Sequence, residues 1–224
     1  MLILFDCDGV LIDSEIIAAD VENRLLKEAG FDIDLTEFMA RFAGLTSARI
    51  FELVGEELGH PLDKELTDRV ESEIDAELDR SLKMIDGVHS MLDQIDDPWC
   101  ICSNSRSAYL QHHLSKFDLY DRFRPYIYSS REVGSKQSKP DPNVFLHAAK
   151  ELDMPAGDCL VVEDSTHGVE AAVAAGMRPI GFTGGSHSYP GHAETLMAAG
   201  AETTVNRMVD LAPTINALKS WRLD

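Results

Sequence analysis

The sequence predicts an α/β protein with a doubly wound parallel sheet and an inserted all-helical domain. Short apolar runs bounded by turn residues recur along the chain, as is typical of strands buried on both faces of a parallel sheet. Amphipathic segments lie between most of these runs and produce the alternation of strand and helix found in doubly wound folds. One long segment after the first run has helical periodicity and many charges but no strand-like run. It therefore indicates a helical insertion.

Five apolar runs are predicted to be strands, and the first of them opens the chain. They cover residues 2–5, 99–102, 126–128, 159–162 and 179–182. Helices are predicted after these runs at 88–95, 107–117, 143–152, 166–175 and 208–219. We therefore expect residues 1–13 and 85–224 to form one α/β core domain.

The segment 14–84 is predicted to be a separate helical domain. Its helices are expected at 16–29, 35–41, 48–58 and 64–82. The chain leaves the first strand through Gly9 and returns through Asp86 and Gly87, which are turn residues suited to a hinge. We interpret the many acidic residues of this segment as solvated helix faces and not as a metal site.

The composition narrows the possible partners. The chain has 224 residues and 44% hydrophobic content, enough to bury a core. Its 39 acidic and 20 basic residues give a net charge of -19, so nucleic acid and anionic membranes are not expected as partners. The first apolar run is interrupted at once by Asp6 and Asp8, so we expect neither a signal peptide nor a membrane span, and we expect a cytoplasmic protein. The four cysteines are interpreted as free thiols.

Two carboxylates follow the first predicted strand. Asp6 and Asp8 are two residues apart at its carboxyl end, so both side chains emerge on the same side. Open parallel sheets bind ligands at this edge, and two carboxylates there carry an electrostatic cost that a cation relieves. Taken alone, the segment also fits an ordinary acidic loop.

Polar residues also follow the next three predicted strands. Ser103 and Asn104 come after the second strand, where a hydroxyl and backbone N–H groups at a helix start can bind phosphate or simply cap the helix. Lys139 follows the third strand in a loop stiffened by two prolines. Glu163 and Asp164 follow the fourth strand, and a helix-capping role is the alternative for Asp164. Each feature is ordinary alone, but together they suggest one site.

The order of these groups resembles the four motifs of the haloacid dehalogenase superfamily. Four consecutive strand ends offer two acids, a hydroxyl, a lysine and two acids. The matching segments are DCDGV at 6–10, the pair at 103–104, KPDP at 139–142 and EDS at 163–165. The helical insertion is similar to the small cap of that superfamily, and the nearest subgroup contains β-phosphoglucomutase and sugar-phosphate or phosphoglycolate phosphatases. The resemblance implies a Rossmann-like core domain with a helical cap domain.

The resemblance also implies an activity and the residues that perform it. We expect a phosphatase that hydrolyses small phosphorylated metabolites, such as sugar or sugar-acid phosphates like 6-phosphogluconate, through an aspartyl phosphate. Asp6 would be the nucleophile and Asp8 the general acid and base. Mg²⁺ would be the cofactor, held by Asp6, Asp8, Glu163 and Asp164. The phosphate would be bound by Ser103, Asn104 and Lys139. We expect the chain to be a monomer.

A mutase of the β-phosphoglucomutase type is the first alternative. Asp8 favours phosphate monoesters, because the dehalogenases and phosphonate-cleaving members of the superfamily generally lack this second aspartate. The mutases carry a histidine twelve residues after the nucleophile, and here that position is Ala18, which argues against a mutase. Arg49 in the segment GLTSAR at 44–49 falls near the place where those mutases bind a distal phosphate. It is equally compatible with an ordinary surface arginine.

A non-catalytic domain that accepts or binds phosphate is the second alternative. Response-regulator receivers combine similar residue types, but they place the acceptor aspartate after the third strand, where this chain offers Lys139. The loop after the fifth strand contains His187, Tyr189 and His192. These residues can line the rim of the site or belong to a simple surface loop, and their roles stay open.

Overall fold

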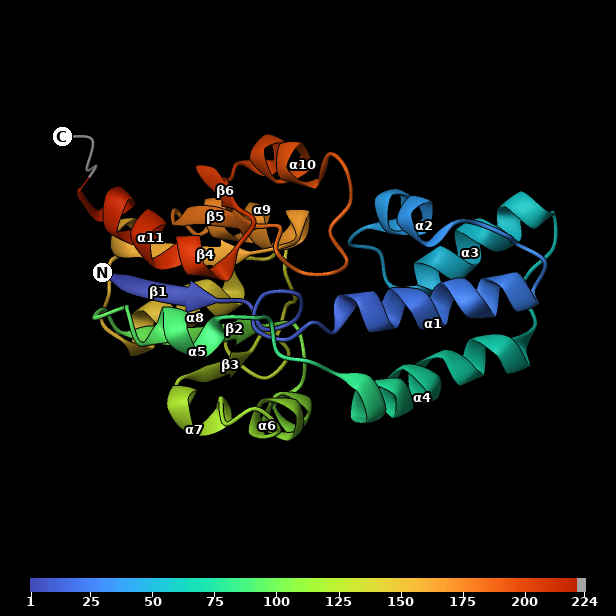
Figure 1. The fold of residues 1–224 in the computed structure, drawn as a ribbon, viewed down its shortest axis with the longest axis horizontal. Coiled ribbons are helices and arrows are strands. Elements are labelled where there is room, and N and C mark those ends of the chain that lie inside the picture. Colours follow the sequence, from blue (N-terminus) through green and yellow to red (C-terminus); the bar gives the residue numbers. More distant parts are fainter. Residues whose placement is uncertain (221–224) are drawn as a thin grey trace.

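The computed structural model describes residues 1–220 and contains one six-stranded parallel sheet (Figure 1). The strands are β1 (Leu2–Phe5), β2 (Trp99–Ser103), β3 (Ile127–Ser129), β4 (Cys159–Glu163), β5 (Arg178–Phe182) and β6 (Thr203–Val205). Their order in the sheet is β3-β2-β1-β4-β5-β6. The central strand β1 therefore lies between β2 and β4, with Phe5 aligned with Val162. This topology confirms the predicted doubly wound α/β fold.

Each of the five predicted strands is observed, and no end shifts by more than one residue. The strand β6 is not predicted by the sequence. It has only three residues at the edge of the sheet, and of these only Val205 is buried. A strand this short, with one buried side chain, gives no apolar run that a sequence pattern could detect.

Two hydrophobic clusters cover the two faces of the sheet, because successive side chains of a strand point to opposite faces. Ile3 and Phe5 of β1 belong to one cluster, and Leu2 and Leu4 belong to the other. The first cluster includes side chains of α5 (Val88–Leu92), α6 (Ser107–Ser115), α7 (Tyr120–Phe123) and α11 (Leu211–Ser220). The second includes side chains of α8 (Asn143–Glu151) and α9 (Thr166–Ala174).

The remaining short elements differ from the sequence-based expectation. The segment predicted as one helix over 208–219 is a 3₁₀ turn, η2 (Met208–Asp210), followed by α11, and another 3₁₀ turn, η1 (Ala156–Asp158), precedes β4. Helices α7 and α10 (His192–Ala199) are not predicted. Helix α10 has a single fully buried apolar residue, Leu196, which packs against Val169. It therefore lacks the apolar stripe by which a helix is recognised in a sequence.

Four helices form a layer beyond the carboxyl ends of the strands (Figure 1). They are α1 (Glu15–Glu28), α2 (Leu35–Phe42), α3 (Ser47–Leu58) and α4 (Lys64–Ser81). This helical layer has a hydrophobic cluster of its own, with Leu25 and Val54 fully buried. The two connections to the sheet run side by side, since Ile12 forms an antiparallel bridge with Met84. The helical layer is thus joined to the rest of the chain by a pair of adjacent segments.

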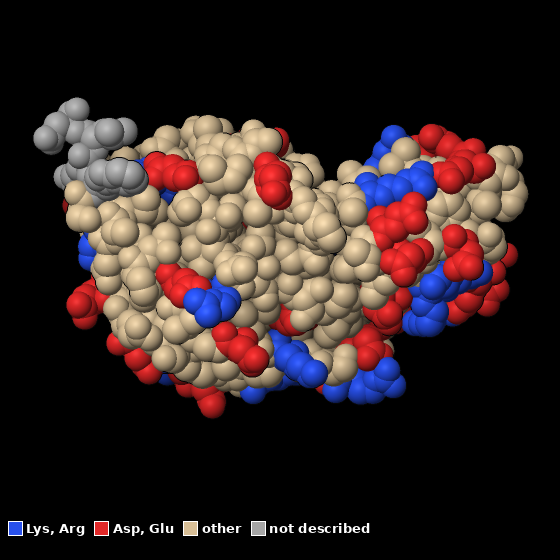
Figure 2. Space-filling model, turned by 45° about the horizontal axis from the view of Figure 1, so that its top comes forward, with Lys and Arg blue, Asp and Glu red and all other residues tan. Residues whose placement is uncertain are grey.

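Charged side chains on the face shown in Figure 2 gather on the helical layer, where basic and acidic groups alternate. Ion pairs connect α1 with α4, since Arg24 lies 2.7 Å from Glu73 and Arg69 lies 3.0 Å from Glu28. Each exposed pair contributes little to stability. The acidic residues involved are solvated and paired on helix surfaces, as the sequence analysis expects. No helix among residues 1–220 is long and apolar enough to cross a membrane.

Phe123 is a large buried side chain of the first hydrophobic cluster, and we expect its removal to destabilise the fold. Its ring is 1% exposed and packs edge-on against Phe5, with 6.0 Å between ring centroids. Phe123→Ala should lower the free energy of unfolding by about 3–5 kcal/mol, because it removes buried apolar surface and leaves a cavity. Urea denaturation measures this change. The control Val209→Ala, at a side chain 56% exposed, should change it by less than about 0.5 kcal/mol, and equal effects of the two substitutions would contradict the assignment of the core.

Candidate active site

The ammonium group of Lys139 lies at the point where three strand ends meet. Its Nζ donates to Asp6 Oδ1 at 2.5 Å, to Glu163 Oε1 at 2.5 Å and to the carbonyl oxygen of Cys102 at 2.7 Å. Asp6 directly follows β1, Cys102 lies in β2 and Glu163 ends β4. Lys139 is only 7% exposed, so all three of its protons are used by protein groups. The structure therefore brings together residues from widely separated parts of the sequence, as the sequence analysis expects.

Two asparagines shape the loop that carries Lys139. Asn104 accepts hydrogen bonds through its Oδ1 from the backbone N–H of Lys139 at 2.9 Å and from Ser130 Oγ at 2.8 Å. Asn143, at the start of α8, donates to the carbonyl of Ser130 at 3.1 Å and accepts from the N–H of Ser135 at 2.8 Å. The Asn104 side chain is thus used to position the lysine loop. The predicted contact of Asn104 with phosphate is therefore one made by its backbone N–H.

Three carboxylates surround the same point. Asp6, Glu163 and Asp164 are each at most 7% exposed, and one oxygen of each lies within 4.8 Å of the other two. Burial raises the pKa of Asp6, Lys139 opposes this effect, and the neighbouring carboxylates add to it. A hard divalent cation such as Mg²⁺ takes oxygen ligands and relieves this repulsion. The donor set therefore fits magnesium.

Lys139 stays protonated in this environment. Burial alone would lower its pKa, but the charges of Asp6 and Glu163 raise the pKa above its ordinary value. One buried ammonium group therefore faces three carboxylates at this edge of the sheet. The excess of negative charge is a further reason why a cation fits the site.

Asp8 is held by hydroxyl groups from both sides of the site. Its Oδ1 accepts from Ser14 Oγ at 2.7 Å and from Tyr109 OH at 2.9 Å, and its Oδ2 accepts from Ser105 Oγ at 2.7 Å. Ser103, buried at the end of β2, lies farther away, with its Oγ 3.5 Å from Asp8 Oδ2. Ser14 immediately precedes α1 of the helical layer, whereas Tyr109 belongs to α6. The carboxylate of Asp8 therefore connects the helical layer to the core.

Tyr109 and Ser105 are contacts that the sequence analysis does not predict. Burial and the charge of Asp8 raise the pKa of Tyr109, so its hydroxyl stays protonated and can donate to the carboxylate. Their position in the sequence could have indicated these contacts, because Tyr109 lies in the first turn of the helix that follows β2 and Ser105 lies just before that turn. Side chains in that turn are close to the carboxyl edge of the sheet.

Two glycines allow the acidic groups to approach the backbone closely. A Cβ atom on Gly168 would lie 1.9 Å from Glu163 Cδ, and a Cβ atom on Gly9 would lie 2.0 Å from Asp164 Oδ2. Gly9 also has a φ of +74°, which side chains disfavour. Both positions therefore require glycine if Glu163 and Asp164 are to occupy their observed places.

The loop after β5 packs against Asp164. His187 Nε2 lies 2.9 Å from Asp164 Oδ2, and His192 Nε2 donates to the Asp164 carbonyl oxygen at 2.7 Å. Burial acts to lower the pKa of His187, but Asp164, Glu15 and Asp13 together outweigh this effect, so the pKa of His187 is raised. Tyr189 stacks on His192, with 4.7 Å between ring centroids. The structure thus places His187 and His192 beside a predicted metal ligand, whereas the sequence leaves their roles open.

The contacts of Arg49 lie within the helical layer. Arg49 occupies the first turn of α3, is exposed, and forms an ion pair with Glu52. Among residues 1–220 it forms no hydrogen bond or ion pair with any of the strand-end residues. Its predicted contact with substrate stays a prediction.

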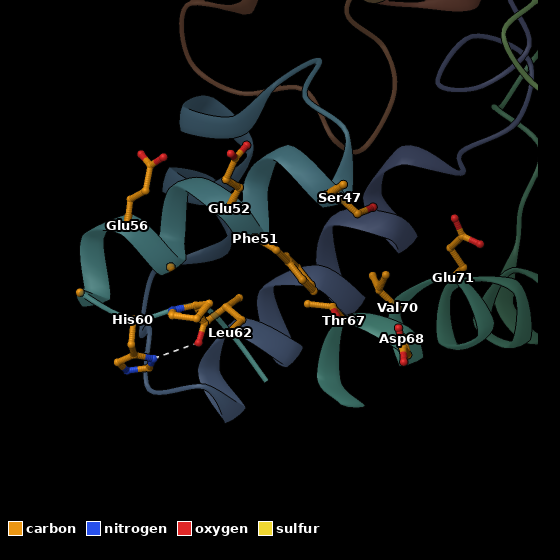
Figure 3. A pocket seen from close by; sticks show the side chains of 14 residues that line it. Ser47, Phe51, Glu52, Glu56, His60, Leu62, Thr67, Asp68, Val70 and Glu71 are labelled. Atoms are coloured by element: carbon orange, nitrogen blue, oxygen red, sulfur yellow. Dashed lines mark hydrogen bonds between the residues drawn. The ribbon is translucent and has the colours of Figure 1, made fainter. Parts of the chain in front are cut away.

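A cavity of about 1000 Å³ lies within the helical layer and not at the strand ends. Its walls come from α3, the loop after it and the first part of α4, and Figure 3 shows Phe51, Leu62 and Val70 together with acidic side chains around it. None of the strand-end residues lines this cavity. It is therefore not part of the candidate active site.

Gly168→Ala should disrupt the carboxylate cluster, because the added methyl group would occupy the place of the Glu163 carboxylate. We expect the affinity for Mg²⁺ to fall by roughly tenfold or more, as when groups that orient metal ligands are lost. Isothermal titration calorimetry measures this affinity. Gly157→Ala is the matched control, because nothing lies within 4 Å of a Cβ atom there. Unchanged Mg²⁺ binding by Gly168→Ala would show that the observed place of Glu163 is not needed for the metal.

Comparisons with known proteins identify the family. Residues 3–182 match the haloacid dehalogenase-like hydrolase family. The 6-phosphogluconate phosphatase of Escherichia coli is 31% identical over 189 residues, which are 84% of this chain and 85% of that protein.

Two solved structures are similar over nearly the whole chain. A haloacid dehalogenase-like protein of unknown function from Agrobacterium tumefaciens is 50% identical, with a TM-score of 0.94 and coverage of 97% of this chain and 98% of the other. A family hydrolase from Deinococcus radiodurans with bound phosphate and sodium is 28% identical, with a TM-score of 0.84 and coverage of 97% and 96%. These matches confirm the predicted fold and superfamily, and relatives named as phosphatases bear out the predicted enzyme class. The chain belongs to the haloacid dehalogenase-like hydrolase family.

Proposed function

We propose that this protein is a magnesium-dependent phosphatase that hydrolyses sugar or sugar-acid phosphates through an aspartyl phosphate on Asp6. The observation that carries the proposal is the buried contact of Asp6 with Lys139, beside Glu163 and Asp164. A similar protein is named for the hydrolysis of 6-phosphogluconate. A structural relative contains bound phosphate.

Asp6 is the proposed nucleophile. In the first step a carboxylate oxygen of Asp6 forms a bond to phosphorus while the bond from phosphorus to the alcohol oxygen breaks. In the second step a water oxygen attacks the same phosphorus, the bond to Asp6 breaks and inorganic phosphate leaves. The contact with Lys139 orients Asp6 and offsets the charge that collects between the carboxylate and the phosphate oxygens.

Asp8 is the proposed general acid and base. It gives a proton to the leaving alcohol oxygen in the first step and takes a proton from the attacking water in the second. Its hydrogen bonds from Ser14, Ser105 and Tyr109 support this role, because they hold the carboxyl group in one orientation next to Asp6. A shift of the helical layer would alter the contact with Ser14, so the position of Asp8 depends on where that layer lies.

The remaining strand-end residues bind the phosphate and the metal in this proposal. Mg²⁺ held by Asp6, Glu163, Asp164 and the Asp8 carbonyl oxygen would neutralise charge on the phosphate oxygens. Support comes from the three carboxylate oxygens that lie within 4.8 Å of one another. The phosphate oxygens would accept hydrogen bonds from the Ser103 hydroxyl and the Asn104 backbone N–H, and the positive charge of Lys139 would offset the negative charge of the phosphate.

We place the boundary between the two proposed domains at the two adjacent connections between the sheet and the helical layer. Residues 1–13 and 85–220 form the core domain, and residues 14–84 form a cap domain that selects the substrate. Residues 221–224, which the sequence-based prediction also assigns to the core, lie outside the described residues. The separate hydrophobic cluster of the helical layer and the bridge between Ile12 and Met84 support this division. A cap that closes over the strand ends leaves room only for a small molecule. Sugar phosphates and sugar-acid phosphates are of that size.

The protein should release inorganic phosphate from 6-phosphogluconate or a related sugar phosphate in the presence of Mg²⁺. Turnover should vanish with a chelator and in Asp6→Asn, because the amide is a poor nucleophile. Phosphate release from a panel of phosphorylated metabolites measures this activity.

The same panel of phosphorylated metabolites distinguishes a phosphatase from a mutase and from a non-catalytic domain. Formation of glucose 6-phosphate from β-glucose 1-phosphate, without net phosphate release, would identify a mutase instead. We expect no such product, because α1 has Ala18 where the mutases carry a histidine. No turnover of any phosphate ester would support a non-catalytic phosphate-binding domain and refute the proposal.

Asp8→Asn should slow hydrolysis of an alkyl phosphate by roughly 10²–10⁴-fold, the usual contribution of a positioned acid or base. With p-nitrophenyl phosphate the leaving group needs no proton, so the first step should survive while attack by water slows. Stopped-flow absorbance should then show a burst of nitrophenol close to one equivalent of enzyme. Asp32→Asn, at a side chain 90% exposed, is the control and should behave as the unsubstituted protein. Equal loss of both steps would contradict the role of Asp8 as the acid.

A further inference from the structure

A group of carboxylate and imidazole side chains, separate from the strand-end residues, joins the helical layer to the core. Asp79 lies in the last turn of α4, and its Oδ1 is 2.7 Å from His112 Nε2 and 2.6 Å from Lys116 Nζ. His112 belongs to α6 and Lys116 directly follows it. The contact therefore spans the two parts of the chain close to the point where the helical layer returns to the core.

A buried histidine completes this group. His113 is only 4% exposed, and its Nδ1 is buried without a hydrogen-bond partner among the described residues. One donor atom from each of Asp79, His112 and His113 lies within 4.8 Å of the other two. The His113 ring is held by an edge contact with Tyr109, with 4.3 Å between centroids. A buried imidazole nitrogen without a partner is costly unless something else binds the ring.

We propose that Asp79, His112 and His113 bind a divalent transition-metal ion of the zinc class, which for Asp79 departs from the interpretation of the acidic residues of 14–84 as solvated helix faces. Two imidazole nitrogens and one carboxylate oxygen are ligands that Zn²⁺ and Co²⁺ accept, whereas Mg²⁺ prefers an all-oxygen set. Water would fill the remaining coordination position or positions. This site is distinct from the carboxylate cluster at the strand ends and does not depend on the proposed reaction.

Metal binding would require movements of about 1 Å among the ligand atoms. Ligand atoms about 2.0–2.1 Å from a tetrahedral Zn²⁺ lie about 3.4 Å apart. The hydrogen-bonded pair of Asp79 and His112 would therefore open by less than about 1 Å, and both would approach the His113 donor atom, which lies within 4.8 Å of them, by at most about 1.4 Å. Both side chains are more than half exposed, at 58% and 56%, and are free to make this movement. His113 is the buried ligand, and its ring is already fixed by its neighbours.

Lys116 modulates the proposed site. Its ammonium group contacts Asp79 at 2.6 Å and therefore competes with a metal ion for the carboxylate and repels it. Removal of this charge should strengthen metal binding, whereas removal of Asp79 or His112 should weaken it. These opposite signs distinguish a metal site from a contact that only stabilises the fold.

The test is a titration of the tag-free protein with Zn²⁺ by calorimetry and with Co²⁺ by visible absorbance, in saturating Mg²⁺. We expect one histidine-ligated ion per chain. Asp79→Asn and His112→Ala should each weaken its binding by roughly tenfold or more, since even groups outside the first coordination shell contribute that much, and Lys116→Met should strengthen it. His60→Ala, at an exposed histidine of the helical layer, should leave it unchanged.

The remaining outcomes are equally informative. His113→Gln should also weaken binding, and thermal unfolding in the absence of metal establishes that this variant is folded. Binding that is unaffected by Asp79→Asn and His112→Ala would place the ion in the carboxylate cluster and overturn the proposal. Loss of binding in His60→Ala, or no Zn²⁺ binding at all, would overturn it as well.

Discussion

The candidate site depends on the hydrogen bonds made by the buried ammonium group of Lys139. The ammonium group holds Asp6 after β1, the Cys102 carbonyl in β2 and Glu163 at the end of β4. Burying a charge is costly unless each of its donors has a partner, and here each does. The loop that carries the lysine must therefore keep one conformation, and the side chains of Asn104 and Asn143 provide the hydrogen bonds that hold it.

The contacts of Lys139 with the carboxylates leave more negative than positive charge at one edge of the sheet. Asp6 and Glu163 contact the same lysine and Asp164 lies beside them, and Gly9 and Gly168 give Asp164 and Glu163 the space they need. A cation is the simplest way to relieve the repulsion. The same arrangement suits phosphoryl transfer, since the anionic phosphate oxygens also need neutralisation. The proposed metal binding and the proposed reaction therefore both require that negative charge be neutralised at these residues.

The helical layer and the connection that leads into it contact the site through a few specific groups. Ser14, just before α1, donates to Asp8, and Asp13, in the connection, accepts a hydrogen bond from Ser186 in the loop that carries His187. Near the return connection, Asp79 of α4 contacts His112 of α6. A movement of the helical layer would alter all three contacts at once. The position of this layer is therefore coupled to the orientation of the proposed general acid.

The amino-acid sequence alone predicts the alternation of strands and helices and the polar residues at successive strand ends, including Asp6 and Lys139. These features are local, because apolar runs and turn residues reflect the burial of each segment. The contact of Tyr109 with Asp8, 101 residues away, and the position of His187 beside Asp164 are seen in the folded structure and cannot be predicted from the sequence. Such contacts arise from the packing of elements distant in sequence, and no periodicity within one segment records which partner it meets.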